Sequence, residues 1–125
     1  MKKNEVRTIP IDLYKCHLTF FAGSMGFIEQ WCRENLADDE DECECVIDNF
    51  KNSIIERQAG GAFVFYEREY FVWVKRPNSM PEIAHELYHA ANYILTNCGV
   101  KHDEIDEPFA YLLEYLMRAV SSKKR

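Results

Sequence analysis

The sequence predicts an α+β fold, and two observations predict it. Two β-rich runs, residues 62–66 and 70–74, are separated by a short polar turn, and two amphipathic helical segments follow them. So short a turn makes the two strands antiparallel neighbours, and their apolar face needs a helix to cover it. The length of 125 residues suits one core, so we expect a single domain over residues 1–125.

The N-terminal part adds strand and helix signals to the hairpin. Residues 6–21 mix β-branched and aromatic side chains, which predicts one or two strands. After Gly23, Ser24 can cap a helix whose apolar residues share one face and which ends near Leu36.

An acidic run, residues 38–44, follows this helix. Such a run predicts a solvated loop or the start of a frayed helix. For residues 45–58 the pattern predicts only helix or irregular structure. Cys43 and Cys45 lack the spacing of a structural zinc site, so we expect free thiols that are exposed or half-buried.

The longest helix is predicted from about Met80 to Cys98. Ser79 and Glu82 fit a capping box at its start, and Gly99 supplies a left-handed stop at its end. A last helix should run from Glu107 or Pro108 to Val120 and bury a leucine-rich face.

The long helix carries His85-Glu86-Leu87-Tyr88-His89, an HExxH motif. Residues four apart share a helix face, so His85 and His89 can direct ring nitrogens onto one ion. Glu86 is rotated by about 100° from His85 and can reach a metal-bound water as a general base. The pattern therefore predicts a Zn²⁺ site with a catalytic role.

A catalytic zinc ion usually takes three protein ligands. Position 95 is Leu95, which excludes the third histidine of the metzincin spacing. Glu107, at the entry to the last helix, is our predicted third ligand, because a return into an antiparallel helix would bring it beside the histidines. His102, Asp103 and Glu104 remain alternatives.

The pattern at residues 85–90, followed by Asp106-Glu107-Pro108 and the residues to Leu113, resembles the small gluzincin-like metallopeptidases of phages and mobile elements. It is more distantly similar to the ImmA/IrrE peptidases, and the similarity covers residues 60–120. The resemblance implies a minimal zincin-like domain, in which a small antiparallel sheet packs on the HExxH helix and the C-terminal helix carries the third ligand. It also implies His85, His89 and Glu107 as ligands and Glu86 as the catalytic base.

The expected reaction is hydrolysis of a peptide bond in a peptide or protein substrate. Tyr111 is the predicted oxyanion donor, with Tyr88 and Tyr93 as alternatives, although each could simply pack. An edge strand of the hairpin, residues 70–74, could pair with an extended substrate.

A rival prediction is a catalytically silent metal-binding or protein-interaction module, and a second is a structural domain in which the histidines are incidental. The net charge of -6 argues against nucleic acid as a partner. No apolar run is long enough for a membrane span, and no signal peptide is evident, so we expect a cytoplasmic protein. The sequence does not indicate an oligomeric state.

Overall fold

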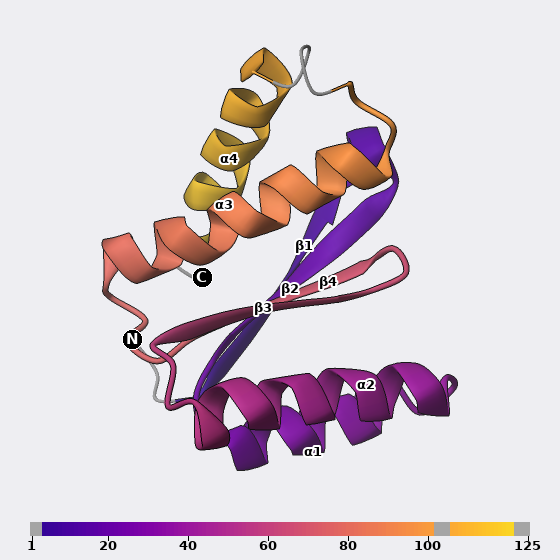
Figure 1. Cartoon of the computed structure of the whole chain (residues 1–125), viewed down its shortest axis with the longest axis vertical. Coiled ribbons are helices and arrows are strands. Elements are labelled where there is room, and N and C mark those ends of the chain that lie inside the picture. Colours follow the sequence, from indigo (N-terminus) through magenta and orange to yellow (C-terminus); the bar gives the residue numbers. More distant parts are fainter. Residues whose placement is uncertain (1–3, 102–105, 122–125) are drawn as a thin grey trace.

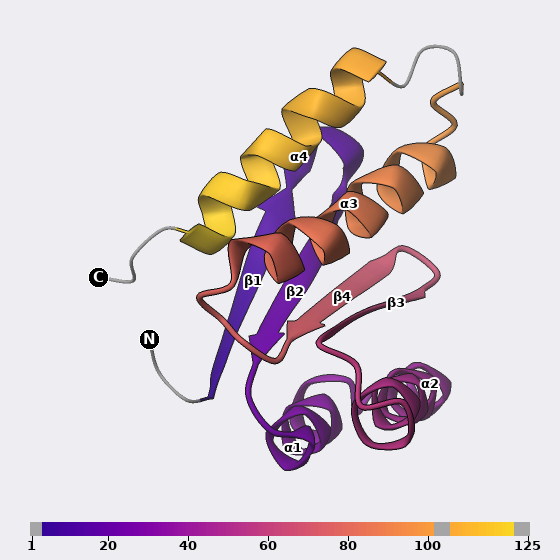
Figure 2. The ribbon, with the colours of Figure 1, turned by 60° about the vertical axis from the view of Figure 1, so that its left-hand side comes forward.

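The structure, a computed structural model, describes residues 4–101 and 106–121. A four-stranded sheet lies between two helical layers, with α1 and α2 on one face and α3 and α4 on the other (Figures 1 and 2). The predicted α+β class is therefore confirmed. In chain order the elements are β1 (Glu5–Ile11), η1 (Asp12–Tyr14), β2 (Cys16–Ala22), α1 (Met25–Asn35), α2 (Glu40–Lys51), η2 (Asn52–Glu56), β3 (Gly61–Tyr66), β4 (Glu69–Val74), α3 (Met80–Asn97) and α4 (Asp106–Ser121).

The sheet has the strand order β1-β2-β4-β3. The predicted hairpin is confirmed as the antiparallel pair β3 and β4, and β1 also pairs with β2 in antiparallel fashion. However, β2 and β4 are parallel, with Leu18 opposite Tyr70, so the sheet as a whole is mixed, where a small antiparallel sheet or hairpin was predicted. Direct turns fix strand direction only between chain neighbours, whereas β2 reaches β4 through α1, α2 and β3.

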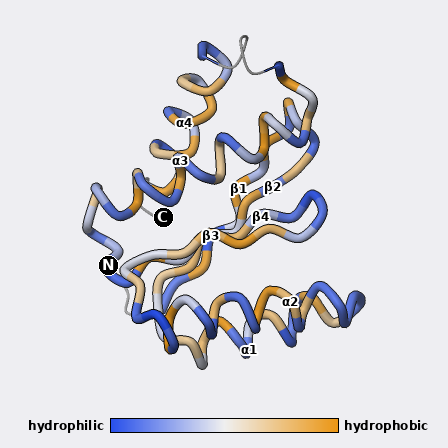
Figure 3. Tube along the Cα trace, viewed as in Figure 1, coloured by the Kyte–Doolittle hydropathy of each residue, from blue (hydrophilic) through white to orange (hydrophobic). Residues whose placement is uncertain are grey.

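Strand β4 lies in the middle of the sheet and is buried on both faces. Phe71 and Trp73 pack into the core under α1 and α2, while Tyr70, Val72 and Val74 pack into the core under α3 and α4. This division follows from the alternation of side chains along a strand. Figure 3 shows the same pattern, with hydrophobic residues along the strands and a hydrophilic β3–β4 turn.

Helices α1 and α2 both begin at a side-chain cap. The Ser24 hydroxyl accepts a hydrogen bond from the Phe27 amide at 3.2 Å, which confirms the predicted cap. Asp39 does the same for Glu42 at 3.0 Å. The acidic run thus forms the start of a helix, where its negative charge interacts favourably with the positive end of the helix dipole.

Burial in α2 exceeds what the sequence predicts. Glu42 and Cys43 are both buried against the sheet, so the expectation of an exposed or half-buried Cys43 is wrong, whereas Cys45 is half-buried as expected. For Cys43 the cause is position, because it belongs to the core cluster that also contains Val64 and Trp73. The chain then continues directly into η2, a π-helix.

Helix α3 ends as predicted, with Gly99 in the left-handed region at φ 81°. Its start differs. Ser79 occupies the N-cap position without a side-chain hydrogen bond, and Glu82 instead accepts from Arg76 at 2.6 Å. The predicted capping box is therefore wrong, because a guanidinium competes for the carboxylate that the box requires.

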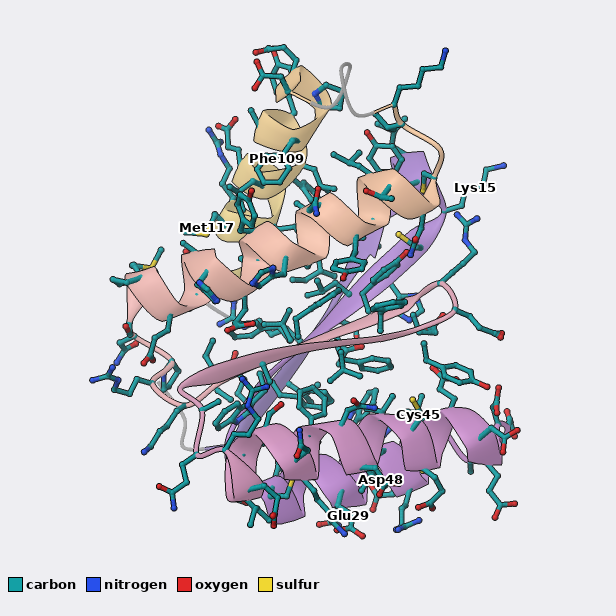
Figure 4. The ribbon with its side chains drawn as sticks, viewed as in Figure 1. Lys15, Glu29, Cys45, Asp48, Phe109 and Met117 are labelled. Atoms are coloured by element: carbon teal, nitrogen blue, oxygen red, sulfur yellow. The ribbon has the colours of Figure 1, made fainter. Side chains whose placement is uncertain are left out.

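Helix α4 packs beside α3 and covers the same face of the sheet. It buries Leu112, Leu116 and Val120. Phe109, labelled in Figure 4, contacts Tyr88 of α3 with ring centroids 5.0 Å apart. This contact fixes which side of α4 faces α3.

Candidate metal site

Two consecutive turns of α3 bring the motif histidines together. The rings of His85 and His89 have centroids 4.8 Å apart and planes at 84°. His85 is exposed, and His89 is partly buried. Two imidazoles at this separation can each direct a nitrogen to one ion, as the i and i+4 spacing predicts.

Glu86 lies beside the histidines but is almost wholly buried, with 7% of its surface exposed. Its Oε2 atom is 3.9 Å from Nε2 of His85. Burial raises the pKa of the Glu86 carboxyl, His85 partly offsets this, and Glu82 adds to it. A carboxylate whose pKa lies above its ordinary range is better matched to taking a proton near neutral pH.

Two glycines lie where the chain enters β3, Gly60 just before the strand and Gly61 as its first residue, and the structure explains why. A Cβ atom on Gly61 would lie 2.8 Å from Oε2 of Glu86, and one on Gly60 would lie 2.7 Å from Oε2 of Glu82. Such distances are too short for carbon and oxygen. The glycines therefore let β3 pass close to the motif side of α3.

A hollow of about 330 Å³ opens beside the motif, within the size range of small-ligand sites. A neighbouring hollow of about 460 Å³ shares part of its wall and extends toward Pro81 and Glu82. The first hollow is lined by Ser53, Arg57, Ala59, Gly61, Ala62, Phe63, His85, Glu86, His89 and Tyr93.

Glu107 and Tyr111 lie elsewhere. Both are exposed on α4 and line a separate hollow of about 560 Å³ with Ile11 and Leu13. Phe109 faces α3, and Glu107, two residues earlier, lies about 200° around the helix, so it faces the other way. The structure therefore does not bring the predicted third ligand and oxyanion donor to the motif histidines.

The alternative ligands His102, Asp103 and Glu104 lie outside the described residues. Within residues 4–101 and 106–121, no group of three or more His, Cys, Asp or Glu side chains is arranged to hold a metal. The described site thus supplies two imidazoles and an adjacent buried carboxylate.

Of the two alternative tyrosines, Tyr93 lines the motif hollow. Its ring packs against Phe63 and Phe65 with centroids 5.4 and 5.0 Å apart. Tyr88 is exposed and contacts Phe109 instead. An aromatic wall on β3 and α3 therefore borders the hollow.

Two features of the site were missed by sequence reasoning. Strand β4, which includes residues 70–74, is paired on both sides, so the prediction that it offers a free edge is wrong. The edge is β3, whose Gly61, Ala62 and Phe63 line the hollow. The second missed feature is Arg57, which lies within residues 45–58, where the sequence predicts only helix or irregular structure.

Comparison of the chain with protein-family models, curated proteins and solved structures found no match. None of the helices that the structure describes is both long enough and apolar enough to cross a membrane.

Proposed function

We propose that this chain is a zinc-dependent peptidase in which His85 and His89 bind the metal and Glu86 is the general base. The observation that carries the proposal is their joint position: two imidazoles on successive turns and a buried carboxylate beside them line one hollow. A purely structural metal site needs no general base.

A bound zinc ion supplies Lewis acidity, which lowers the pKa of a bound water and polarises a carbonyl. Glu86 takes the proton of the attacking water and delivers it to the leaving amine. Its burial keeps the carboxylate from being fully solvated, and Gly61 restricts the space around it.

The open edge of β3 supports a peptide as the substrate. An edge strand presents unpaired amides and carbonyls, to which an extended peptide can add as a further strand. Because β3 begins next to Glu86, a peptide paired there passes beside the proposed base.

The test combines metal analysis with peptide hydrolysis. We expect the wild-type protein to contain about one zinc per chain and to cleave a peptide library in a chelator-sensitive manner. Glu86→Gln should retain the zinc and lose at least about 100-fold in kcat. Unchanged turnover would remove Glu86 from the mechanism.

Ligand variants locate the metal. His85→Ala and His89→Ala should each lose zinc. Glu107→Gln tests the predicted third ligand, whose carboxylate lines another hollow in the structure. Weakened zinc binding in that variant would assign Glu107 to the metal, whereas unchanged affinity would exclude it.

One observation favours a second candidate, a catalytically silent metal-binding or interaction module. The described residues bring together two imidazoles and no third ligand, while the β3 edge stays open for a partner. A protein that retains zinc and binds peptides without cleaving any would establish this second function.

A further inference from the structure

Arg57 follows η2 and lines both hollows beside the motif. Its side chain is exposed, and the described residues offer its guanidinium no hydrogen bond or ion pair. The other arginines within residues 4–101 and 106–121 all have polar partners: Arg7 with Glu5, Arg33 with Glu29 and Glu44, Arg68 with the Tyr14 carbonyl, Arg76 with Glu82, and Arg118 with Glu114. Arg57 is thus a cation available to a ligand.

The direction of β3 indicates which end of a peptide meets this cation. Strand β3 runs from Gly61 to Tyr66, so Arg57 precedes its first residue. A peptide paired antiparallel to β3 runs the opposite way, and its C-terminal end therefore lies toward Arg57. A parallel peptide would instead bring its N-terminal ammonium to a guanidinium of the same sign, which is unfavourable.

We propose that Arg57 binds the C-terminal carboxylate of the substrate, so that the site cleaves peptides close to a free C-terminus. The inference rests on the proposed peptidase function. A guanidinium has planar geometry and forked donors that match a carboxylate with two parallel hydrogen bonds. Arg57 is thereby a residue that determines specificity.

The position of Glu86 limits the length of the released fragment. Glu86 lies against Gly61, at the start of β3, and shares the hollow with Arg57. The bond to be cleaved therefore lies only a short stretch of peptide from the bound carboxylate. Water adds its hydroxyl to the carbonyl carbon, the carbon–nitrogen bond breaks, and the amide nitrogen takes the proton, which releases a short peptide or amino acid without any redox change.

The aromatic wall lies on the opposite side of Gly61 along β3. Phe63 and Tyr93 line the hollow, and Phe65 packs on Tyr93. In the antiparallel orientation these rings lie beside residues on the N-terminal side of the cleaved bond. The hollow thus pairs an anion-binding end with an apolar wall.

The experiment uses the full-length, zinc-loaded protein and three fluorescent peptides of one sequence. The first has a free C-terminus, the second a C-terminal amide, and the third is an amide whose last residue is replaced by aspartate. We expect KM for the free acid to be about 10- to 100-fold below that for the amide, with similar kcat. Equal KM values for acid and amide would overturn the inference, and so would an Asp-amide handled as well as the acid.

Arg57→Gln should abolish this preference by raising KM for the acid while leaving the amide unchanged, and Arg57→Lys should restore part of it. Arg33→Gln is the matched control, because Arg33 is an exposed arginine on α1 far along the chain from the site. An equal loss on acid and amide in Arg57→Gln would mark a structural role and overturn the inference.

A binding measurement separates this inference from the proposed function. Anisotropy of the same peptides on Glu86→Gln reports recognition without turnover. If the zinc-loaded wild-type protein hydrolyses none of the peptides while Glu86→Gln binds the acid preferentially, the role of Arg57 in binding stands and the peptidase is refuted. Equal binding of acid and amide would refute the role of Arg57 whether or not the wild type is active.

Discussion

The two helical layers differ in how they are held together. In the α1–α2 layer both helices have capping side chains, and Arg33 joins Glu29 of α1 to Glu44 of α2. In the α3–α4 layer, α3 has no side-chain cap. Exposed tyrosines are concentrated there, namely Tyr88, Tyr93, Tyr111 and Tyr115. Side-chain caps and an interhelical ion pair thus hold the α1–α2 layer, whereas the α3–α4 layer exposes more tyrosine rings.

Each helical layer contains a buried glutamate, Glu42 in α2 and Glu86 in α3. Comparing them shows how burial alone affects a carboxyl group. Oε2 of Glu42 is buried without a hydrogen-bond partner among the described residues. Desolvation, reinforced by Glu69, Asp39 and Glu67, raises the pKa of the Glu42 carboxyl to about 7. Glu86 is buried to a similar extent but borders a hollow and two histidines. A buried carboxylate therefore indicates function only where a ligand can reach it.

Among the substitutions that test this difference between Glu86 and Glu42, Gly61→Ala should have the largest effect. The added Cβ would lie 2.8 Å from both Cγ and Oε2 of Glu86, so that side chain must shift. We expect kcat for peptide hydrolysis to fall at least about tenfold, because Glu86 is the proposed general base, while the free energy of unfolding changes by about 1 kcal/mol or less.

Gly26→Ala, in α1, is the control for this substitution, because its added Cβ would meet only Oγ of Ser24, at an ordinary contact distance of 3.9 Å. That variant should keep full activity and gain about 0.5–1 kcal/mol of stability. If Gly61→Ala retained wild-type kcat, the position of Glu86 would not matter for turnover.

Glu42→Gln should have an intermediate effect that depends on pH. The unfolded carboxyl loses its proton near its ordinary pKa of 4.5, whereas the folded one loses it near 7. Between these values the folded chain binds more protons, so wild-type stability falls as pH rises from 4.5 to 7. The variant should therefore be about 1–2 kcal/mol more stable than wild type at pH 8 and nearly equal to it at pH 4.

Urea unfolding at pH 4, 5.5 and 8 measures this difference. Glu44→Gln is the matched control on the same helix, since Glu44 is only partly buried and pairs with Arg33. It should lose up to about 1 kcal/mol, without the pH profile of Glu42→Gln. A difference between Glu42→Gln and wild type that stays constant over this pH range would contradict the raised pKa.

The smallest effects are expected from replacing the serines at two N-cap positions, Ser24 of α1 and Ser79 of α3. Ser24→Ala removes the hydrogen bond to the Phe27 amide and should destabilise the protein by about 1 kcal/mol. Ser79→Ala removes no such bond and should change stability by less than about 0.5 kcal/mol. Thermal unfolding of both variants distinguishes them, and equal losses would mean that Ser79 does cap α3.

Local patterns in the sequence predict the elements well. The short turn at Glu67 identifies the hairpin, and Ser24 and Gly99 mark helix ends that the structure confirms. Each of these features depends on residues only a few positions apart. The His85 and His89 pairing is of the same kind, because one helix fixes it.

Features that depend on distant contacts were not predictable. The parallel pairing of β2 with β4 joins segments separated by two helices. The sequence predicts that Glu42 is solvated, and only the packing of α2 on the sheet shows that it is buried. The orientation of Glu107 depends on which side of α4 packs on α3. Arg57 carries no motif at all, and only the fold brings it to the hollow.

The π-helix η2 determines the direction in which the residues that follow α2 face. In a π-helix each hydrogen bond spans one residue more than in an α-helix, so η2 accommodates an inserted residue without unwinding α2. Removing one residue would restore α-helical spacing and turn the following chain by about 100°. Arg57 would then be turned away from the hollow, so the register of one short segment determines whether this cation faces the site.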